Sequence, residues 1–397
     1  MFSKYKKIFL IAILIRILVI PFFYHPDIKS QLFHMQFLSH GITNIYDFVD
    51  KNKSHLPYTN IYVYLPFTYY FFGSVDFILS PLYPHDLYTW LNDWGVNQNS
   101  YPNLMFFMLV LKIPYLIFDL LIGFILYKIY KNEKLLYFWL FNPVSIYLIY
   151  VLGNFDVIPS FLTLLALYFI KNHKQLLSYL TIGLAISLKM YPIMFLPFLF
   201  FYDTKNIFKN IKYAIFALVP LVISIIPFIY QKSFYDSFIG SGLTQKILEF
   251  KLSGVPLFPI FFIIILINYY LSKNKYRFEI AILQTFFIFI GLVIFHPQWI
   301  MWFLPFFSVL FVEGKIKTKI FFSLFFFLIF IYIFLFDDNF LFWGHLVAID
   351  PSFASLNSPY QIIKLKTSLN PSIIQKNIHY LLLGSGILGS IYYAKKK

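Results

Sequence analysis

Long apolar runs recur from one end of this 397-residue chain to the other, and charged residues bound each of them. Hydrophobic residues make up 60% of the sequence and charged residues only 12%, with a mean hydropathy of +0.72. A soluble domain carries about 25% charged residues to cover its surface. A water-soluble fold is therefore excluded, and the sequence predicts an all-α polytopic membrane bundle.

Reading the apolar runs between charges predicts about 12 transmembrane helices in one domain over residues 1–397. Several runs are shorter than the roughly 20 residues that a crossing helix needs, so we expect some half-helices beside a cavity. Three long outer loops are expected, at 24–103, 230–255 and 337–378, and Tyr62 to Leu82 in the first of them is predicted to be an interfacial helix. The runs are 8–23, 104–127, 135–152, 155–170, 175–188, 190–202, 211–229, 256–271, 279–295, 298–312, 319–336 and 379–394.

The placement of the basic residues supports this count. With the N-terminus inside, 20 of the 32 Lys and Arg residues fall in the short inner segments, and 10 fall in the much longer outer ones. An error of one span would reverse the bias after it. We therefore expect both termini on the cytoplasmic side, in the plasma membrane of a prokaryote or the ER membrane of a eukaryote, and interpret the net charge of +15 as topology rather than nucleic-acid binding.

Cysteine is absent, which excludes disulfides, thiolate metal sites and thiol nucleophiles. The N-terminal apolar run follows three lysines, as in a signal peptide, but no small-residue cleavage site follows it, so we take it as the first span. No internal repeat is visible.

Asp27 lies a few residues beyond the outer end of the first span, where its carboxylate could accept a proton from a hydroxyl substrate. The alternative is a solvated loop aspartate. His25, Asp27 and His34 together could suggest a metal site, but their spacing fits no compact ligand set.

Three further polar motifs interrupt the apolar runs at predicted outer junctions. In Gly153-Asn154-Phe155-Asp156, the aspartate falls in the first turn of a helix, where free N–H groups stabilise a carboxylate; Asn154 and Asp156 could also face the hydroxyls of a sugar. Lys189, followed by Tyr191, could neutralise a lipid-linked phosphate or extend to lipid headgroups.

His296, Gln298 and Trp299 form the third junction motif, His296-Pro297-Gln298-Trp299. A histidine beside tryptophan is often only an interfacial residue. It shares its predicted face with Asp27, Asp156 and Lys189, and this coincidence favours a site there.

Asp119 and Arg16 lie at similar depths within the second and first spans. Either charge would be costly alone in hydrocarbon, so we predict a structural ion pair between the two helices.

These motifs, in this order, resemble the multi-spanning GT-C glycosyltransferases that use polyprenyl-phosphate sugars, especially those similar to the enzyme that adds the second mannose of GPI anchors. The resemblance covers about three quarters of the chain. This chain departs from the family pattern in the first outer loop, where many relatives have a paired acidic motif and this chain has only the single Asp27. The matching pieces are Asp27, Gly41 to Tyr46, Tyr64-Leu65-Pro66, Lys112 to Asp119, Asn142-Pro143, Gly153 to Asp156, Lys189 to Pro192 and His296 to Trp299.

The resemblance implies inverting transfer of a hexose, expected to be mannose, from a polyprenyl-phosphate donor to a lipid- or protein-linked acceptor on the non-cytoplasmic face, as in cell-envelope glycan assembly. No cofactor is implied beyond the lipid-linked sugar, the metal requirement stays open, and the partners are membrane lipids and the two substrates rather than nucleic acid. The resemblance assigns Asp27 as the base and Lys189 and His296 to the donor phosphate. Asn154, Asp156, Tyr191, Gln298 and Trp299 would contact the sugar or acceptor.

Three other classes of membrane protein compete with this interpretation. A transporter or lipid flippase would use Arg16, Asp119 and the short spans as a path near the midplane, but the polar motifs cluster on one face. A polysaccharide polymerase or ligase would be expected to carry arginines in its outer loops, and none occurs there. A structural scaffold is the remaining class.

Overall fold

The protein is predominantly helical, in a computed structural model that describes residues 2–59, 61–202, 207–238, 240, 246–293 and 295–394. Among these residues the only strands are β1 (Lys251–Leu252) and β2 (Val255–Pro256), which form an antiparallel hairpin that the all-α prediction missed. Ser253 and Gly254 both have positive φ at its turn, as a two-residue hairpin loop requires.

The first half of the chain supplies α1 to α14. The 3₁₀ or π segments (η) between them mark breaks, most of them next to proline. The bounds are α1 Phe2–Val19, η1 Ile20–Phe22, α2 Pro26–Met35, η2 Gln36–Leu38, α3 Ile45–Asn52, α4 Pro66–Leu79, η3 Ser80–Leu82, α5 Leu87–Asn92, η4 Val96–Asn99, α6 Leu104–Leu111, α7 Ile113–Tyr130, α8 Glu133–Leu140, α9 Pro143–Ile146, η5 Tyr147–Val151, α10 Val157–Lys171, α11 Gln175–Leu188, η6 Tyr191–Phe195, α12 Leu196–Phe200, α13 Ile207–Ile225, η7 Ile226–Phe228 and α14 Lys232–Phe238.

The second half supplies the remaining helices, with a run of short 3₁₀ segments in the last outer loop. The bounds are η8 Lys246–Leu248, α15 Leu257–Leu271, α16 Arg277–Leu292, η9 Pro297–Trp302, α17 Leu304–Glu313, α18 Ile316–Phe334, η10 Asn339–Leu341, η11 Trp343–Ala348, η12 Pro351–Ser355, α19 Pro359–Lys366 and α20 Pro371–Ala394.

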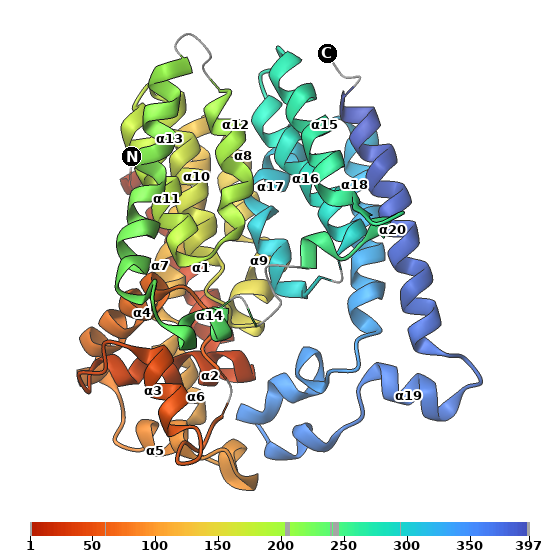
Figure 1. The fold of residues 1–397 in the computed structure, drawn as a ribbon. Helices are drawn as coiled ribbons and strands as arrows, with labels where there is room; N and C mark the ends of the chain where they lie inside the picture. Colours follow the sequence, from red (N-terminus) through yellow and green to blue (C-terminus); the bar gives the residue numbers. More distant parts are fainter. Residues whose placement is uncertain are drawn as a thin grey trace.

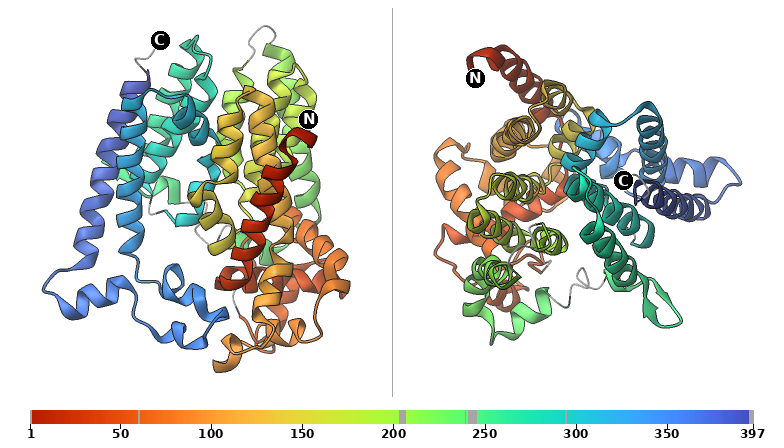
Figure 2. Two further views of the ribbon diagram at one scale, coloured as in Figure 1. Left: turned by 180° about the vertical axis from the view of Figure 1, so that it is seen from behind. Right: turned by 90° about the horizontal axis from the view of Figure 1, so that it is seen from above.

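The long helices form two groups that stand side by side (Figures 1 and 2). In the first group α7 packs on α10, α10 on α11 and α11 on α13; in the second, α15 and α20 pack on α16, and α18 packs on α20. Contact between α17 and α8 joins the groups. Both termini lie toward one end, and α2 to α5 and α19 cap the opposite end, which we call the capped end (Figure 1).

Each of the twelve predicted spans coincides with one or more of these helices, but their lengths do not establish twelve crossings. Within the described part of the chain, three helices are long and apolar enough to cross a membrane, at Ile113–Tyr130, Ile207–Phe228 and Ile316–Phe334. Two bent pairs raise the number to five: Tyr5–Phe22 with Pro26–Leu38, bent by 89°, and Glu133–Leu140 with Pro143–Val151, bent by 43°. Five other apolar helices are shorter, as half-helices beside a cavity would be.

Small residues let neighbouring helices approach closely. A Cβ atom added to Gly183 in α11 would lie 2.1 Å from the backbone oxygen of Ala217 in α13, and one added to Gly291 in α16 would meet Leu383 of α20. Close backbone approach at glycine is the usual packing mode of helices in a membrane, where side-chain burial gives little driving force.

Arg16 and Asp119 form the ion pair that the sequence predicts. Arg16 Nε donates to Asp119 Oδ2 at 2.5 Å, and neither side chain is exposed. The same carboxylate accepts from the Tyr150 hydroxyl at 2.7 Å and from Trp139 Nε1 at 2.8 Å, and Arg16 also donates to the Leu140 carbonyl at 2.9 Å. One buried cluster therefore ties α1 to α7, α8 and η5.

We expect Asp119→Asn to destabilise the protein by about 3–5 kcal/mol, because it leaves the Arg16 guanidinium buried without a counter-charge. Thermal unfolding of detergent-solubilised protein, followed by tryptophan fluorescence, measures this. The double variant Arg16→Met with Asp119→Leu should regain most of the loss. An unchanged midpoint in Asp119→Asn would contradict a structural role.

The absence of native cysteine makes the membrane orientation directly testable. Ser54→Cys, at the capped end, should react with a membrane-impermeant maleimide added to the non-cytoplasmic side of sealed vesicles of known orientation. Lys174→Cys, an exposed residue between α10 and α11, should react only after the membrane is permeabilised. The reverse labelling pattern would overturn the predicted orientation.

Candidate active site

Asp27 lies in the first turn of α2, directly after the 89° bend that follows α1. His25 is the N-cap of this helix, and its Nδ1 accepts from the Asp27 backbone N–H at 3.2 Å. The same nitrogen lies 3.7 Å from Asp27 Oδ2. The Asp27 side chain is 40% exposed, whereas that of His25 is 5% exposed. The Asp27 carboxylate is therefore accessible from outside the protein, and the buried His25 ring lies next to it.

Asp27 is joined to the Gly153–Asp156 motif through one glutamine. Gln298 Nε2 donates to Asp27 Oδ2 at 2.7 Å, and Gln298 Oε1 accepts from Asn154 Nδ2 at 2.5 Å. Asn154 Oδ1 in turn accepts from the Asp156 backbone N–H at 3.1 Å. Three segments that are far apart in sequence therefore meet in one hydrogen-bonded chain.

Asp156 and Lys189 complete this chain with an ion pair. Lys189 Nζ lies 2.5 Å from Asp156 Oδ1; the carboxylate is buried, and the lysine side chain is 17% exposed. Asp156 is the N-cap residue of α10, but its side chain makes no capping hydrogen bond. Its carboxylate is directed to Lys189 instead, so helix capping does not account for it. Gly153 has a φ of +61°, which favours glycine at the turn before the motif.

Aromatic rings stack beside the ion pair. The Tyr191 and Trp302 rings are parallel with centroids 4.2 Å apart, and Trp302 stacks on Trp299 at 5.1 Å. Lys189 Nζ lies 5.8 Å from the Trp302 ring centroid, and Lys246 Nζ lies 5.5 Å from that of Trp299. Tyr191 and Trp302 are buried, so the partly exposed Trp299 is the ring of this row that offers rigid apolar surface beside polar groups, as the apolar face of a sugar requires.

His296 lies at the η9 N-terminus, within electrostatic reach of both Asp27 and Lys189. Burial lowers its pKa below the usual 6.5, against the opposing effect of Asp27. Burial likewise lowers the pKa of His25. Both rings are therefore neutral near pH 7, and each can donate one N–H.

Three site features were not assigned from sequence. Lys112 is fully buried between α6 and α7 and donates to the Phe23 carbonyl at 2.5 Å and the Tyr150 carbonyl at 2.6 Å, joining the segments before Asp27 and Asp156. The Tyr64 hydroxyl accepts from Gln31 at 3.4 Å and lies within electrostatic reach of both carboxylates. The third feature is Asp338, in the last outer loop, which acts on His25 and His296. Tyr64 and Lys112 fall in motifs that the sequence singled out; Asp338 does not.

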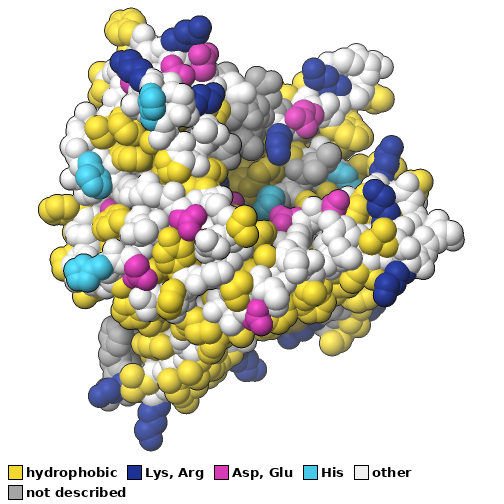
Figure 3. Space-filling model, turned by 90° about the horizontal axis from the view of Figure 1, so that it is seen from below, with side chains coloured by type: hydrophobic (Ala, Val, Ile, Leu, Met, Phe, Trp, Pro, Cys, Tyr) yellow, Lys and Arg dark blue, Asp and Glu magenta, His cyan; other side chains and the backbone are white. Residues whose placement is uncertain are grey.

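The structure thus gathers every predicted site residue at one place near the capped end: Asp27, Asn154, Asp156, Lys189, Tyr191, His296, Gln298 and Trp299. Seen from the capped end, the molecule is hollowed near its centre, and acidic and histidine side chains gather in and around the hollow (Figure 3). His34 takes no part in it; its Nδ1 bonds to the Ser30 carbonyl. Among the described residues no group of three His, Asp or Glu side chains is placed to hold a metal ion.

Comparison with known proteins supports the resemblance drawn from the sequence. Residues 120–247, about a third of the chain, match the family model of glycosyltransferase family 87. GPI mannosyltransferase 1 of Kluyveromyces lactis is 36% identical over 91 residues, which are 21% of this chain and 22% of that protein. The chain resembles GT-C-like membrane mannosyltransferases. The matched part spans about a fifth of that relative's length, and no solved structure matches.

The family-87 match spans the segments that carry Asn154, Asp156, Lys189 and Tyr191. Asp27 and the His296 motif lie outside it. The relative is a GPI mannosyltransferase 1, whereas the sequence motifs had suggested the enzyme that adds the second mannose.

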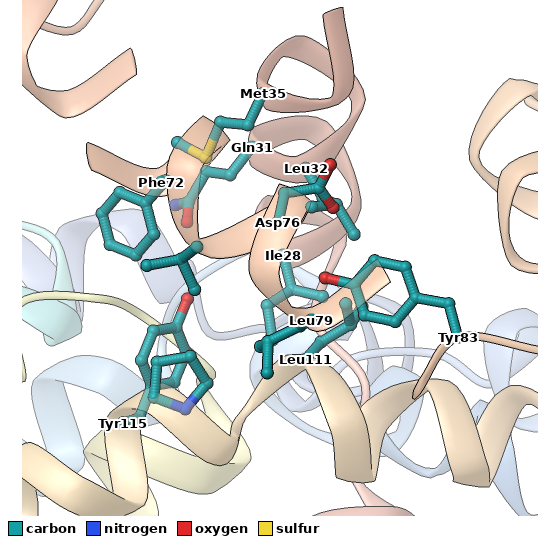
Figure 4. A pocket seen from close by; sticks show the side chains of 12 residues that line it. Ile28, Gln31, Leu32, Met35, Phe72, Asp76, Leu79, Tyr83, Leu111 and Tyr115 are labelled. Atoms are coloured by element: carbon teal, nitrogen blue, oxygen red, sulfur yellow. The ribbon is translucent and has the colours of Figure 1, made fainter. Parts of the chain in front are cut away.

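A separate small cavity of about 40 Å³ lies beneath α2, between α4 and the α6–α7 junction (Figure 4). Asp76 of α4 and Tyr83 line it together with Gln31 and Tyr115. Asp76 is only 1% exposed. Burial raises its pKa to about 6, against the opposing effects of the Tyr83 hydroxyl and His40. The cavity has room for about one water molecule rather than for a sugar.

We expect Asp76→Asn to stabilise the protein at pH 7.5 by up to about 3 kcal/mol. The folded-state pKa lies above the unfolded value, so the carboxylic acid favours folding below about pH 4, and this contribution is lost as the pH rises through about 6. Thermal unfolding at pH 4 and 7.5 measures the difference, with the exposed Asp50→Asn as a control. Equal effects at both pH values would contradict this prediction.

Proposed function

We propose that this protein is an inverting glycosyltransferase that transfers a hexose, expected to be mannose, from a polyprenyl-phosphate donor to a lipid- or protein-linked acceptor on the non-cytoplasmic face. The single observation that carries the proposal is the connected chain from Asp27 through Gln298 and Asn154 to Asp156 and Lys189. It couples an accessible carboxylate to a cation across one site. Inversion requires one base for the acceptor and a positive environment for the leaving phosphate.

Asp27 is suited to accept the acceptor's proton. Its carboxylate is 40% exposed and accepts a hydrogen bond from Gln298 Nε2, while the Asp27 backbone N–H donates to His25 Nδ1 and fixes the main chain at this residue. As the acceptor oxygen bonds to the anomeric carbon, its proton passes to Asp27. The bond between the anomeric carbon and the phosphate oxygen breaks, and its electron pair leaves with the phosphate.

Lys189 is suited to receive the charge that develops on the phosphate. It is partly exposed, and among the described residues Asp156 is the only acid within ion-pair distance of it, so a dianionic phosphate can compete for its ammonium. A neutral His296 would add an N–H donor. The partly exposed Trp299 ring, supported by the buried Trp302 and Tyr191 rings, would hold the apolar face of the sugar.

The transporter alternative is disfavoured by the packing of the charges at mid-depth. Arg16 and Asp119 are fully buried and hydrogen-bonded to Tyr150, Trp139 and the Leu140 carbonyl. A substrate path would require such groups to line an open channel.

Purified protein in lipid nanodiscs, incubated with radiolabelled polyprenyl-phosphate mannose and membrane lipid acceptors, tests the proposal. Asp27→Asn should lower the turnover at least about 100-fold, because it removes the base and keeps the side-chain shape. The exposed Asp50→Asn, also in the first outer loop, should behave as wild type. Undiminished transfer by Asp27→Asn, or no transfer by wild type from any polyprenyl-linked sugar, would overturn the proposal.

Lys189→Gln should lower turnover by about 10²- to 10³-fold, as loss of one charge-stabilising donor does in other enzymes. Lys189→Arg retains the charge and the pairing to Asp156, so it separates loss of function from loss of folding. Lys251→Met, in the second outer loop, is the matched control. If Lys189→Gln and Lys251→Met have equal activity, Lys189 does not act on the phosphate.

A further inference from the structure

The segment from Asp338 to Ala348, in the last outer loop, docks against the residues that precede Asp27. The Tyr24 N–H donates to the His345 carbonyl at 2.8 Å, and His345 Nδ1 lies 3.2 Å from the Tyr24 carbonyl. The rings of His25 and His345 lie 5.8 Å apart, and those of Tyr24 and Phe340 lie 5.9 Å apart. In Figure 1 this part of the chain, between α18 and α19, extends back toward α2.

Asp338 is held firmly at the start of this segment. Its Oδ1 accepts from the Phe340 N–H at 2.8 Å and caps η10. The next residue, Asn339, donates to the carbonyls of Phe353 and Ala354 at 3.1 and 2.9 Å. One carboxylate oxygen of Asp338 accepts the capping hydrogen bond, and the residue is half-buried rather than exposed.

The charge of Asp338 reaches both imidazoles of the site. The negative charges of Asp27 and Asp338 raise the pKa of His25, and the positive charge of Lys112 lowers it, in addition to the larger lowering by burial. The same two acids raise the pKa of His296, whereas Lys189 and His25 lower it. The negative charges of Asp27 and Asp338 therefore act on the same two histidines.

We propose that Asp338 is a further carboxylate of the site, besides Asp27 and Asp156, and that with Asp27 it selects an acceptor sugar that carries no negative charge near its reacting hydroxyl. The proposal rests on the glycosyltransferase function proposed above. Sugar hydroxyls donate well to carboxylates, and such charge-assisted hydrogen bonds are short and strong. An acidic sugar in the same position would meet the negative charges of Asp27 and Asp338, a repulsive arrangement that discriminates between acceptors.

Two synthetic acceptors that differ in charge test this selectivity: octyl mannoside, which is neutral, and octyl glucuronide, which is acidic. Transfer from radiolabelled polyprenyl-phosphate mannose gives kcat and KM for each, and thermal-shift titration without donor gives binding alone. Wild type should favour the mannoside at least about tenfold in both measurements, as expected for loss of one charge-assisted hydrogen bond and gain of repulsion.

Asp338→Asn keeps the oxygen that caps η10 and removes the charge. Its KM for octyl mannoside should rise about tenfold with the donor KM unchanged, and its preference over the glucuronide should shrink by a similar factor. The acidic limb of its pH profile should move to lower pH, because Asp338 raises the pKa of His25 and His296. Asp338→Glu should retain the preference. The matched control is the neighbouring Asp337→Asn, whose carboxylate accepts from the Ser358 hydroxyl and is exposed.

The two proposals fail in different ways. Equal binding of both glycosides by wild type, binding of neither, or identical acceptor KM values for Asp338→Asn and Asp337→Asn would overturn the role of Asp338. Retained preference in binding, with no transfer by wild type from any polyprenyl-linked sugar, would overturn the glycosyltransferase proposal alone.

Discussion

Two buried cations hold together the segments on which the site is built. Arg16 joins α1 to α7 through Asp119, and the same carboxylate accepts from Tyr150 in η5. Lys112 joins the carbonyl groups of Phe23 and Tyr150 closer to the site. Only a few residues separate Phe23 from Asp27 and Tyr150 from Asp156. The contacts made by Arg16 and Lys112 therefore help to fix the positions of both carboxylates. A buried cation is costly unless it is paired and hydrogen-bonded, and here the partners of Arg16 and Lys112 come from the two segments that they join.

The bends next to the site are tied to the same need to give buried polar groups hydrogen-bond partners. The chain turns by 89° after η1, which brings Asp27 across the bundle instead of out into solvent. A π-helical segment, Tyr147–Val151, precedes the Gly153 turn, and such segments interrupt the regular hydrogen bonds of a helix. Lys112 compensates by donating to the freed Phe23 and Tyr150 carbonyls. Irregular backbone is thus tolerated where a buried donor or a cavity lies beside it.

The sequence predicted the helical segments and much of the site because these depend on local patterns. Apolar runs bounded by lysine locate the helices, and polar residues between short runs, such as Asn154, Lys189 and Gln298, stand out against hydrocarbon. The count of crossings was less predictable: the run at 104–127 breaks at Lys112, and the one at 135–152 bends after α8. Hydropathy does not reveal a bend within an apolar run.

His345 could not be recognised because it contacts Tyr24 and His25, more than 300 residues earlier in the chain, and Asp338 lies on the same docked segment. Nothing in the composition of the last outer loop distinguishes Asp338 from Asp337. The β1–β2 hairpin was missed for a different reason, since its strands have two residues each and carry no alternating pattern.

The pairing of Tyr24 with His345 has a consequence for biosynthesis. Tyr24 emerges early from the ribosome, whereas its partner follows after α18 has been synthesised. Until then the segments that carry His25 and His345 cannot meet, so a nascent chain inserted only through its first half lacks the complete candidate site. The site is completed late, once α18 and the last outer loop have been synthesised.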